Sequence, residues 1–294
     1  MPSPAFDVMT PGARTTFQDL GRHGHAALGV GSSGAADLAG HRLANRLVGN
    51  DDRAVTLEVV LGGLELCARD TVLVALTGAR RATDVNGRAI GFHSPFTLAA
   101  GDILRVGYGP TQVYTYLAVA GGFVAPRVLG SSSTDQLSGI GPAPLAAGTT
   151  LHAADAAAVR GHRVDIAPVP QPTEPVELLV ARGPRADWFG ADALAELCRV
   201  PYVVTSNSSR VALRLDGPRI GQIRSDELRS EALVPGAIQL PPDGLPIVFG
   251  ADHPVTGGYP VLAVVRSADL DAAAQAHPGA QVHFRLASSR RRGR

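Results

Sequence analysis

The apolar residues of the first half gather in short runs that glycines interrupt. Such runs predict strands at residues 56–61, 71–76, 103–107 and 113–119, with an earlier strand near Ala5–Met9. Gly62-Gly63, Asn86-Gly87 and Gly101-Asp102 mark turns between them. Strands this close together leave no room for intervening helices. The pattern therefore predicts a mainly β chain with antiparallel sheets or barrels rather than βαβ units.

Only a few short segments have the spacing of a helix. The first is 35–48, with Asp37 in its first turn and Gly49-Asn50 as a C-terminal stop. Two more are predicted at 191–199 and 268–276, and Ser267 is the expected N-cap of the last.

The second half again reads as strands, at 176–180, 202–205, 211–215, 238–240, 246–249, 261–265 and 281–286. Between the halves lies APVPQPTEP (167–175), a semi-rigid proline-rich linker. We therefore expect an N-terminal β domain at 1–166, a C-terminal β domain at 176–287 and a disordered basic tail at 288–294.

The composition excludes several classes of function. The 294 residues are 45% hydrophobic, enough for sizeable cores, and the net charge of +1 gives no argument for nucleic acid or a membrane surface. All 27 basic residues other than histidine are arginine, so lysine-based chemistry is excluded. Two isolated cysteines, Cys67 and Cys198, and an N-terminus unlike a signal peptide predict a cytoplasmic protein.

Three local patterns suggest a nucleotide site, a metal site or a nucleophile, but the surrounding sequence does not support these functions. Gly29–Gly34 matches the dinucleotide motif G-x-G-x-x-G, with Glu58 at the spacing expected for a ribose ligand, but no convincing strand precedes it. His23 and His25 form a close pair that no further ligand completes, so loop packing is favoured over a metal site. Ser131 or Ser133 could be a nucleophile, although neither lies in a G-x-S-x-G elbow.

The stretch 230–260, SEALVPGAIQLPPDGLPIVFGADHPVTGGYP, combines an apolar hairpin with polar side chains. Its 241–244 segment predicts a tight turn, and 256–260 a second turn where glycines permit close approach. A stiff β frame that holds a few polar groups is typical of a small-molecule site. The alternative is a buried hairpin whose polar groups satisfy its own turns.

This stretch resembles the signature of the allophanate hydrolase subunit 2 family, which includes KipA, the C subunit of 5-oxoprolinase and part of the urea carboxylase carboxyltransferase domain. Further motifs of that family occur in order as TTFQDLGR, LGVGSSGAAD, LANRLVGN, LEVVLGG, LTGA, YLAVAGG and VLGSSSTD. The resemblance implies two cyclophilin-like β-barrel domains. It also implies a KipI-like (allophanate hydrolase subunit 1) partner, in a heterodimer or heterotetramer, and a small amide or lactam substrate.

In this family context we expect an enzyme subunit that is active only with its partner, of the ATP-dependent 5-oxoprolinase or biotin-dependent carboxyltransferase type. No cofactor is expected to be bound covalently. ATP is expected at the level of the complex, and biotin on another protein. The expected catalytic residues are Asp19, Arg22, Arg210, Glu231 and Gln239. The expected substrate-binding residues are Gln18, Asp37, Asn45, Ser230, Asp243, Thr256, Gly257, Gly258 and Tyr259, and no metal ligand is expected.

Some positions depart from the family pattern. Ser132 stands where an arginine is usual, and Val211-Ala212-Leu213 replaces Met-Gly-Tyr. These departures favour an alternative function, a KipA-type regulator that binds a KipI-like kinase inhibitor and catalyses nothing.

Overall fold

The computed structural model describes residues 2–155, 166–169, 173–224 and 226–287. The chain divides into two compact units, 1–171 and 172–294. It is mainly β, with 35% strand and 11% helix, so the predicted fold class is confirmed. The predicted linker at 167–175 lies partly outside the described residues and the predicted basic tail at 288–294 wholly outside them, so these boundaries stay predictions.

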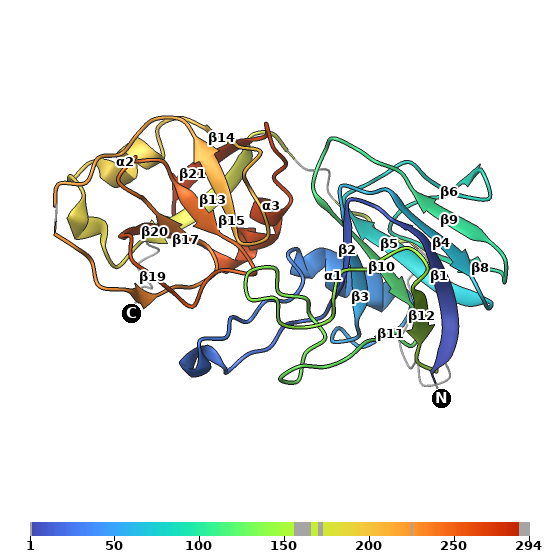
Figure 1. Ribbon diagram of the computed structural model, residues 1–294. Coiled ribbons are helices and arrows are strands. Elements are labelled where there is room, and N and C mark those ends of the chain that lie inside the picture. The colour runs from blue at the N-terminus through green and yellow to red at the C-terminus, as the bar shows by residue number, and fades with distance from the viewer. Residues whose placement is uncertain (1, 156–165, 170–172, 225, 288–294) are drawn as a thin grey trace, which may run out of the picture. The chain divides into compact units, whose positions relative to one another are not determined.

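The N-terminal unit contains two sheets in which every strand pair is antiparallel (Figure 1). The five-stranded sheet consists, in spatial order, of β2 (Arg14–Gln18), β3 (Thr56–Val60), β10 (Tyr114–Val119), β5 (Val72–Gly78) and β8 (Pro95–Leu98). The seven-stranded sheet consists of β11 (Phe123–Val124), β12 (Thr150–Ala153), β1 (Ser3–Pro11), β4 (Leu64–Ala68), β9 (Ile103–Val106), β6 (Thr83–Val85) and β7 (Arg88–Ala89).

The two faces of the five-stranded sheet differ sharply in chemistry. Cross-strand pairing puts one apolar row across four strands: Phe17, Leu57, Leu117 and Leu76, all buried in the core. The neighbouring row points to the opposite face because strand side chains alternate. That row is polar, and it consists of Thr16, Glu58, Tyr116 and Thr77.

Helix α1 (Leu38–Leu47) covers the polar face, as Figure 1 shows. Asp37 is its N-cap, with Oδ1 accepting from the Gly40 N–H at 2.8 Å, so the helix begins three residues later than predicted. The polar row bonds to this cover, because Thr77 Oγ1 donates to the Gly40 carbonyl at 2.6 Å and Glu58 accepts from the Ala36 N–H at 2.9 Å. A short 3₁₀ helix, η1 (Ala26–Leu28), precedes it.

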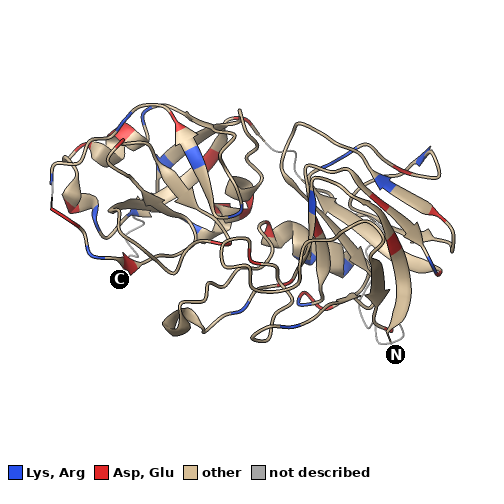
Figure 2. Ribbon diagram, viewed as in Figure 1, with Lys and Arg blue, Asp and Glu red and all other residues tan. Residues whose placement is uncertain are grey.

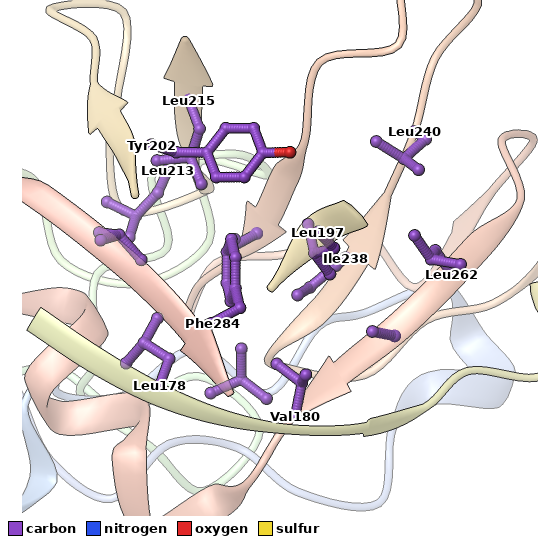
Figure 3. Close-up of a cluster of buried hydrophobic side chains, with 14 of the residues drawn as sticks. Leu178, Val180, Leu197, Tyr202, Leu213, Leu215, Ile238, Leu240, Leu262 and Phe284 are labelled. Atoms are coloured by element: carbon purple, nitrogen blue, oxygen red, sulfur yellow. The ribbon is translucent and has the colours of Figure 1, made fainter. Parts of the chain in front are cut away.

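The C-terminal unit is a closed barrel. Its strands are, in order, β13 (Val176–Arg182), β20 (Val261–Val265), β17 (Ala237–Gln239), β18 (Ile247–Phe249), β15 (Ala212–Asp216), β14 (Tyr202–Val204) and β21 (Gln281–Leu286). Alternate residues such as Leu178, Val180, Ile238 and Phe284 point inward and form its core (Figure 3).

Smaller elements complete the C-terminal unit. They are the strand pair β16 (Glu231–Ala232) and β19 (Thr256–Gly257), the α-helices α2 (Ala193–Leu197) and α3 (Leu270–Ala274), and the 3₁₀ helices η3 (Ala186–Trp188) and η4 (Ser267–Asp269). The predicted Ser267 cap is wrong: neither η4 nor α3 has a side-chain cap. Acidic and basic positions are interspersed over the ribbon in Figure 2, in keeping with the near-neutral net charge.

Candidate functional site

Asp19 lies just beyond the end of β2 and organises the loop at 131–133. Its Oδ1 accepts from Ser131 Oγ and Ser133 Oγ, both at 2.6 Å, and from the Gly21 N–H at 2.8 Å. Its Oδ2 accepts from the Ser132 N–H at 2.7 Å. Burial raises the pKa of Asp19, but these hydrogen bonds outweigh it and hold the pKa below its usual value. Asp19 is therefore an ionised anchor whose oxygens are already occupied.

The serines of this loop are fully buried and bonded to Asp19. A serine nucleophile needs a base that takes its proton. The group that receives both hydroxyl hydrogens is instead a carboxylate with a lowered pKa, which is a weak base. The geometry is that of a structural clamp, which joins the end of β2 to a segment more than 110 residues further along the chain.

Arg22 is the largest fully buried side chain among the described residues, at 2% exposure. One of its nitrogens, Nη2, donates to the Ser133 carbonyl. Nε and Nη1 are buried and have no hydrogen-bond partner among the described residues, and no carboxylate of those residues lies within 4 Å. A buried guanidinium with unused donors and no counter-ion is a candidate anion site.

Gln18 lies on the polar face of the sheet and is fully buried. Its Nε2 donates to Thr16 Oγ1 at 3.1 Å and to the Thr134 carbonyl at 2.9 Å. Its Oε1 is buried without a hydrogen-bond partner among the described residues. Gln18, Asp19 and Arg22 therefore all contact the same segment, 131–134, and the structure brings these three predicted residues together.

Two other predicted residues of the N-terminal unit serve helix α1. Asp37 caps it, and its N–H donates to Tyr116 Oη at 2.8 Å. Asn45 Nδ2 donates to the Ala54 carbonyl at 2.8 Å, and its Oδ1 accepts from Asn50 at 3.0 Å. Burial, with Glu58 and Asp37 nearby, raises the pKa of Tyr116 well above its usual value, so the phenol remains a donor to Glu58.

The Gly29–Gly34 motif does not form a phosphate cradle. The segment packs on the chain around Gly21, where Arg22 N–H donates to the Ser32 carbonyl at 2.7 Å. A Cβ at Gly34 would lie 3.0 Å from Gly21 N, so this glycine serves contact between two stretches of backbone. Glu58 is engaged by Tyr116 and Ala36 rather than exposed to a ribose. The described strands are antiparallel here, so the nucleotide-binding interpretation is not supported.

In the C-terminal unit, Arg210 has a buried counter-ion, Asp252. Its Nε donates to Asp252 Oδ2 at 2.8 Å and its Nη2 to Asp252 Oδ1 at 3.0 Å, and both side chains are buried. Glu231 forms a more exposed pair with Arg185. Hydrogen bonding to Arg185 holds the pKa of Glu231 below its usual value. Asp252 was not predicted as a functional residue, and only the fold reveals its pairing.

The predicted hairpin at 230–260 mostly satisfies its own polar groups. Gln239 Nε2 donates to the Tyr259 carbonyl at 2.7 Å, and a Cβ at Gly257 would lie 2.8 Å from that nitrogen. The turn at 241–244 is confirmed: Gly244 N–H donates to Pro241 O at 2.9 Å, and Asp243 Oδ1 accepts from Leu245 N–H. Ser230, Thr256, Gly258 and Tyr259 are exposed and converge on no common group of the described residues.

The described residues contain no group of three or more His, Cys, Asp or Glu side chains arranged for a metal ion. His23 Nε2 instead contacts the Leu20 carbonyl at 2.9 Å, in keeping with loop packing. Within the same residues, no helix is long and apolar enough to span a bilayer.

Comparisons with known proteins converge on one family. The family model described as "Carboxyltransferase domain, subdomain A and B" matches residues 28–286. The 5-oxoprolinase C subunit of Haemophilus influenzae is 33% identical, over 96% of this chain and 91% of that protein. The protein of the same name from Escherichia coli is 34% identical, over 94% of this chain and 89% of that protein. The crystal structure of K. lactis urea amidolyase superposes with a TM-score of 0.91 at 30% identity, over 98% of this chain and 19% of that one.

Proposed function

The chain belongs to the family of carboxyltransferase domains, subdomain A and B, and on this premise we propose that it is one subunit of a heteromeric enzyme that processes a small amide or lactam. The membership confirms the resemblance inferred from the sequence motifs. The proposed partner is a KipI-like protein. The observation that carries the proposal is the buried cluster of Arg22, Gln18 and Asp19.

The share of each relative that this chain covers favours a function like that of the 5-oxoprolinase C subunit over one like that of urea carboxylase. The chain covers 91% and 89% of two proteins with the first name but 19% of the urea amidolyase chain. A subunit of this kind supplies part of an active site, and other polypeptides supply the rest.

The cluster has the parts that amide chemistry requires. Opening of an amide, or carboxyl transfer to one, develops negative charge on oxygen, and preorganised donors stabilise that charge. Arg22 supplies buried N–H groups of fixed positive charge, which suit an anionic oxygen of the substrate, either one that develops in the reaction or one that the substrate already carries. Gln18 Oε1 supplies an acceptor for a substrate N–H. Asp19 positions both side chains indirectly, because three of its hydrogen bonds hold residues 131–133, and Arg22 and Gln18 bond to the carbonyls of Ser133 and Thr134.

The proposed cofactors belong to the complex. Biotin is attached to proteins through lysine, and this chain contains none, so the proposal places any biotin on another protein. ATP would supply the driving force for lactam opening. The glycine motif at 29–34 packs through Gly34 on the backbone of Leu20 and Gly21, and its Ser32 carbonyl accepts from the Arg22 N–H, so no ATP site and no step are assigned to it here.

One departure that favoured the alternative regulator function is Ser132, which stands where an arginine is usual in the family. Ser132 holds Asp19 through its backbone N–H, which almost any residue would supply. The departure therefore leaves the Asp19 cluster intact, and the enzyme function is the better supported of the two.

The test is reconstitution with the KipI-like partner, with and without the third 5-oxoprolinase component. We expect ATP-dependent turnover of 5-oxoproline in the full complex, and none with any component omitted. Urea with carboxylated biotin is the comparison substrate. A complex that assembles but turns over neither 5-oxoproline nor urea would contradict the enzyme function. The KipA-type regulator function would then be the remaining explanation.

A further inference from the structure

We infer that Arg22 and Gln18 form a recognition site for a small carboxylate that also carries an amide N–H. Arg22 would bind the carboxylate, and Gln18 Oε1 would accept the N–H. The inference rests on the proposed function and deepens it, because it names the chemical groups that the substrate presents to this chain.

The first step is the uncompensated charge of Arg22. An arginine keeps its proton at any accessible pH, so burial cannot be relieved by neutralisation. Nε carries one N–H and Nη1 carries two, and none of the three has an acceptor among the described residues. Leaving donors of a buried cation unbonded is costly unless a ligand completes them. The missing partner is an anion with oxygen acceptors.

The neighbouring carboxylate is not available for that role. Asp19 and Arg22 both bond to Ser133, the first to its hydroxyl and the second to its carbonyl. Asp19 nevertheless receives four donors from serines and backbone and forms no ion pair with Arg22. The fold thus bonds a fixed anion, Asp19, to the same serine, while Nε and Nη1 of Arg22 stay without an acceptor among the described residues, so Arg22 can accept a second anion without breaking an existing pair.

The second step fixes the orientation of the Gln18 amide. Oxygen and nitrogen of an amide side chain are distinguished by their hydrogen bonds. The Thr134 carbonyl can only accept, so the group 2.9 Å from it must be the NH₂ of Gln18. The oxygen therefore faces the other way, where it has no donor among the described residues. What it lacks is an N–H, as found on an amide, urea or lactam.

The third step is the shared support of the two side chains. Arg22 bonds to the carbonyl of Ser133 and Gln18 to the carbonyl of the next residue, Thr134. A Cβ at Gly141 would lie 2.1 Å from the Ser133 carbonyl oxygen and 3.1 Å from Arg22 Nη2, so the contact is tightly confined. Groups held this firmly lose little entropy when a ligand arrives.

These requirements separate the small molecules that the family name suggests. Urea has N–H groups for Gln18 and a carbonyl oxygen that can accept from Arg22, but it has no negative charge to pair with the guanidinium. Bicarbonate has charge but no amide, so it would complete Arg22 alone. A lactam with a carboxylate, such as 5-oxoproline, would complete both.

The test is calorimetric binding to the full chain, with 5-oxoproline, 2-pyrrolidinone and urea as probes. 2-Pyrrolidinone is the same lactam without the carboxylate. We expect 5-oxoproline to bind at least about tenfold more tightly than either, since a charge-assisted hydrogen bond is worth a factor of this size. Arg22→Met should abolish the preference, and Arg22→Lys should restore part of it. Arg46→Met, which removes an exposed arginine of the same unit, is the matched control and should bind as the unaltered chain does.

Equal binding of 5-oxoproline by the unaltered chain and Arg22→Met would overturn the inference, as would no binding or no preference over 2-pyrrolidinone. These results are independent of turnover. A complex that turns over substrate with the Arg22→Met chain at unchanged KM would retain the proposed function and lose the inference. A chain that shows the Arg22-dependent preference for 5-oxoproline but yields no active complex would retain the inference and contradict the proposed function.

Discussion

Two of the three buried arginines among the described residues, Arg22 in the N-terminal unit and Arg210 in the C-terminal unit, have opposite surroundings. Arg210 in the C-terminal unit is 4% exposed and bonds through two nitrogens to the two oxygens of Asp252. Arg22 in the N-terminal unit is 2% exposed and donates to a single carbonyl. The same side chain is thus buried once with a matched counter-ion and once without a carboxylate within 4 Å among the described residues.

The difference separates a stabilising role from a functional one. The guanidinium of Arg210 is neutralised by a buried carboxylate that it bonds through two nitrogens, so Arg210, although predicted as catalytic, is better explained as part of the barrel's framework. An incomplete set of donors contributes little to the fold and retains the capacity to bind. Burial alone therefore does not distinguish structural from functional arginines, whereas an account of their hydrogen-bond partners does.

The largest effect is expected from breaking the complete pair. Arg210→Met leaves Asp252 buried without its counter-ion, which should lower the free energy of unfolding by about 3–5 kcal/mol. Urea denaturation of the full chain, monitored by the fluorescence of Trp188 in the same unit, measures the change. The double variant Arg210→Met with Asp252→Leu removes both charges and should recover much of the loss. A loss below about 1 kcal/mol in the single variant would show that the pair is not a framework element.

A smaller effect is expected at Asp19, the hub of the incomplete site. Asp19→Asn places an NH₂ group against donors that now face a carboxylate oxygen, and should cost about 2 kcal/mol at pH 7. The cost should depend on pH. Because the pKa of Asp19 is lowered in the fold, its contribution is present above the unfolded pKa of about 3.9 and is lost as the pH falls through the lower folded value.

The measurement compares unfolding of the unaltered chain and Asp19→Asn between pH 7 and pH 3. The difference between their unfolding free energies should stay constant down to about pH 4 and then shrink. Subtracting one from the other removes the contribution of every other carboxyl group. A difference that does not change with pH would mean that Asp19 is not the ionised anchor of the serine loop.

Much of the fold could be predicted from the spacing of apolar runs. The strands at 56–61, 103–107 and 281–286 agree with β3, β9 and β21 to within a residue. Helix ends were less accurate, because they depend on single hydrogen bonds such as the cap at Asp37. The Ser267 cap failed because the chain there begins with a 3₁₀ turn, and Asp269 uses its carboxylate on Leu179 N–H instead.

The site could be predicted in its residues but not in its partners. Motif resemblance singled out Gln18, Asp19 and Arg22 within one short segment. Their partner segment at 131–134 lies more than 100 residues away, and no periodicity connects the two. Whether an arginine such as Arg22 or Arg210 finds a carboxylate depends on this long-range packing, so the sequence could not distinguish them.

The smallest effect on stability is expected at Arg22, and it completes the comparison. Arg22→Met removes a buried charge that has no counter-ion within 4 Å among the described residues, together with one hydrogen bond to Ser133. The relief of desolvation and the lost bond act in opposite directions, and methionine fills a similar volume. The free energy of unfolding should therefore change by less than about 1 kcal/mol, against about 3–5 kcal/mol for Arg210→Met under the same conditions. Added 5-oxoproline sharpens the contrast: it should stabilise the unaltered chain and Arg210→Met but not Arg22→Met, because only a ligand bound to the folded state raises the unfolding free energy. If Arg22→Met instead unfolds the chain as readily as Arg210→Met does, then Arg22 is a framework residue whose remaining donors are satisfied in the protein, and the division between the two arginines fails.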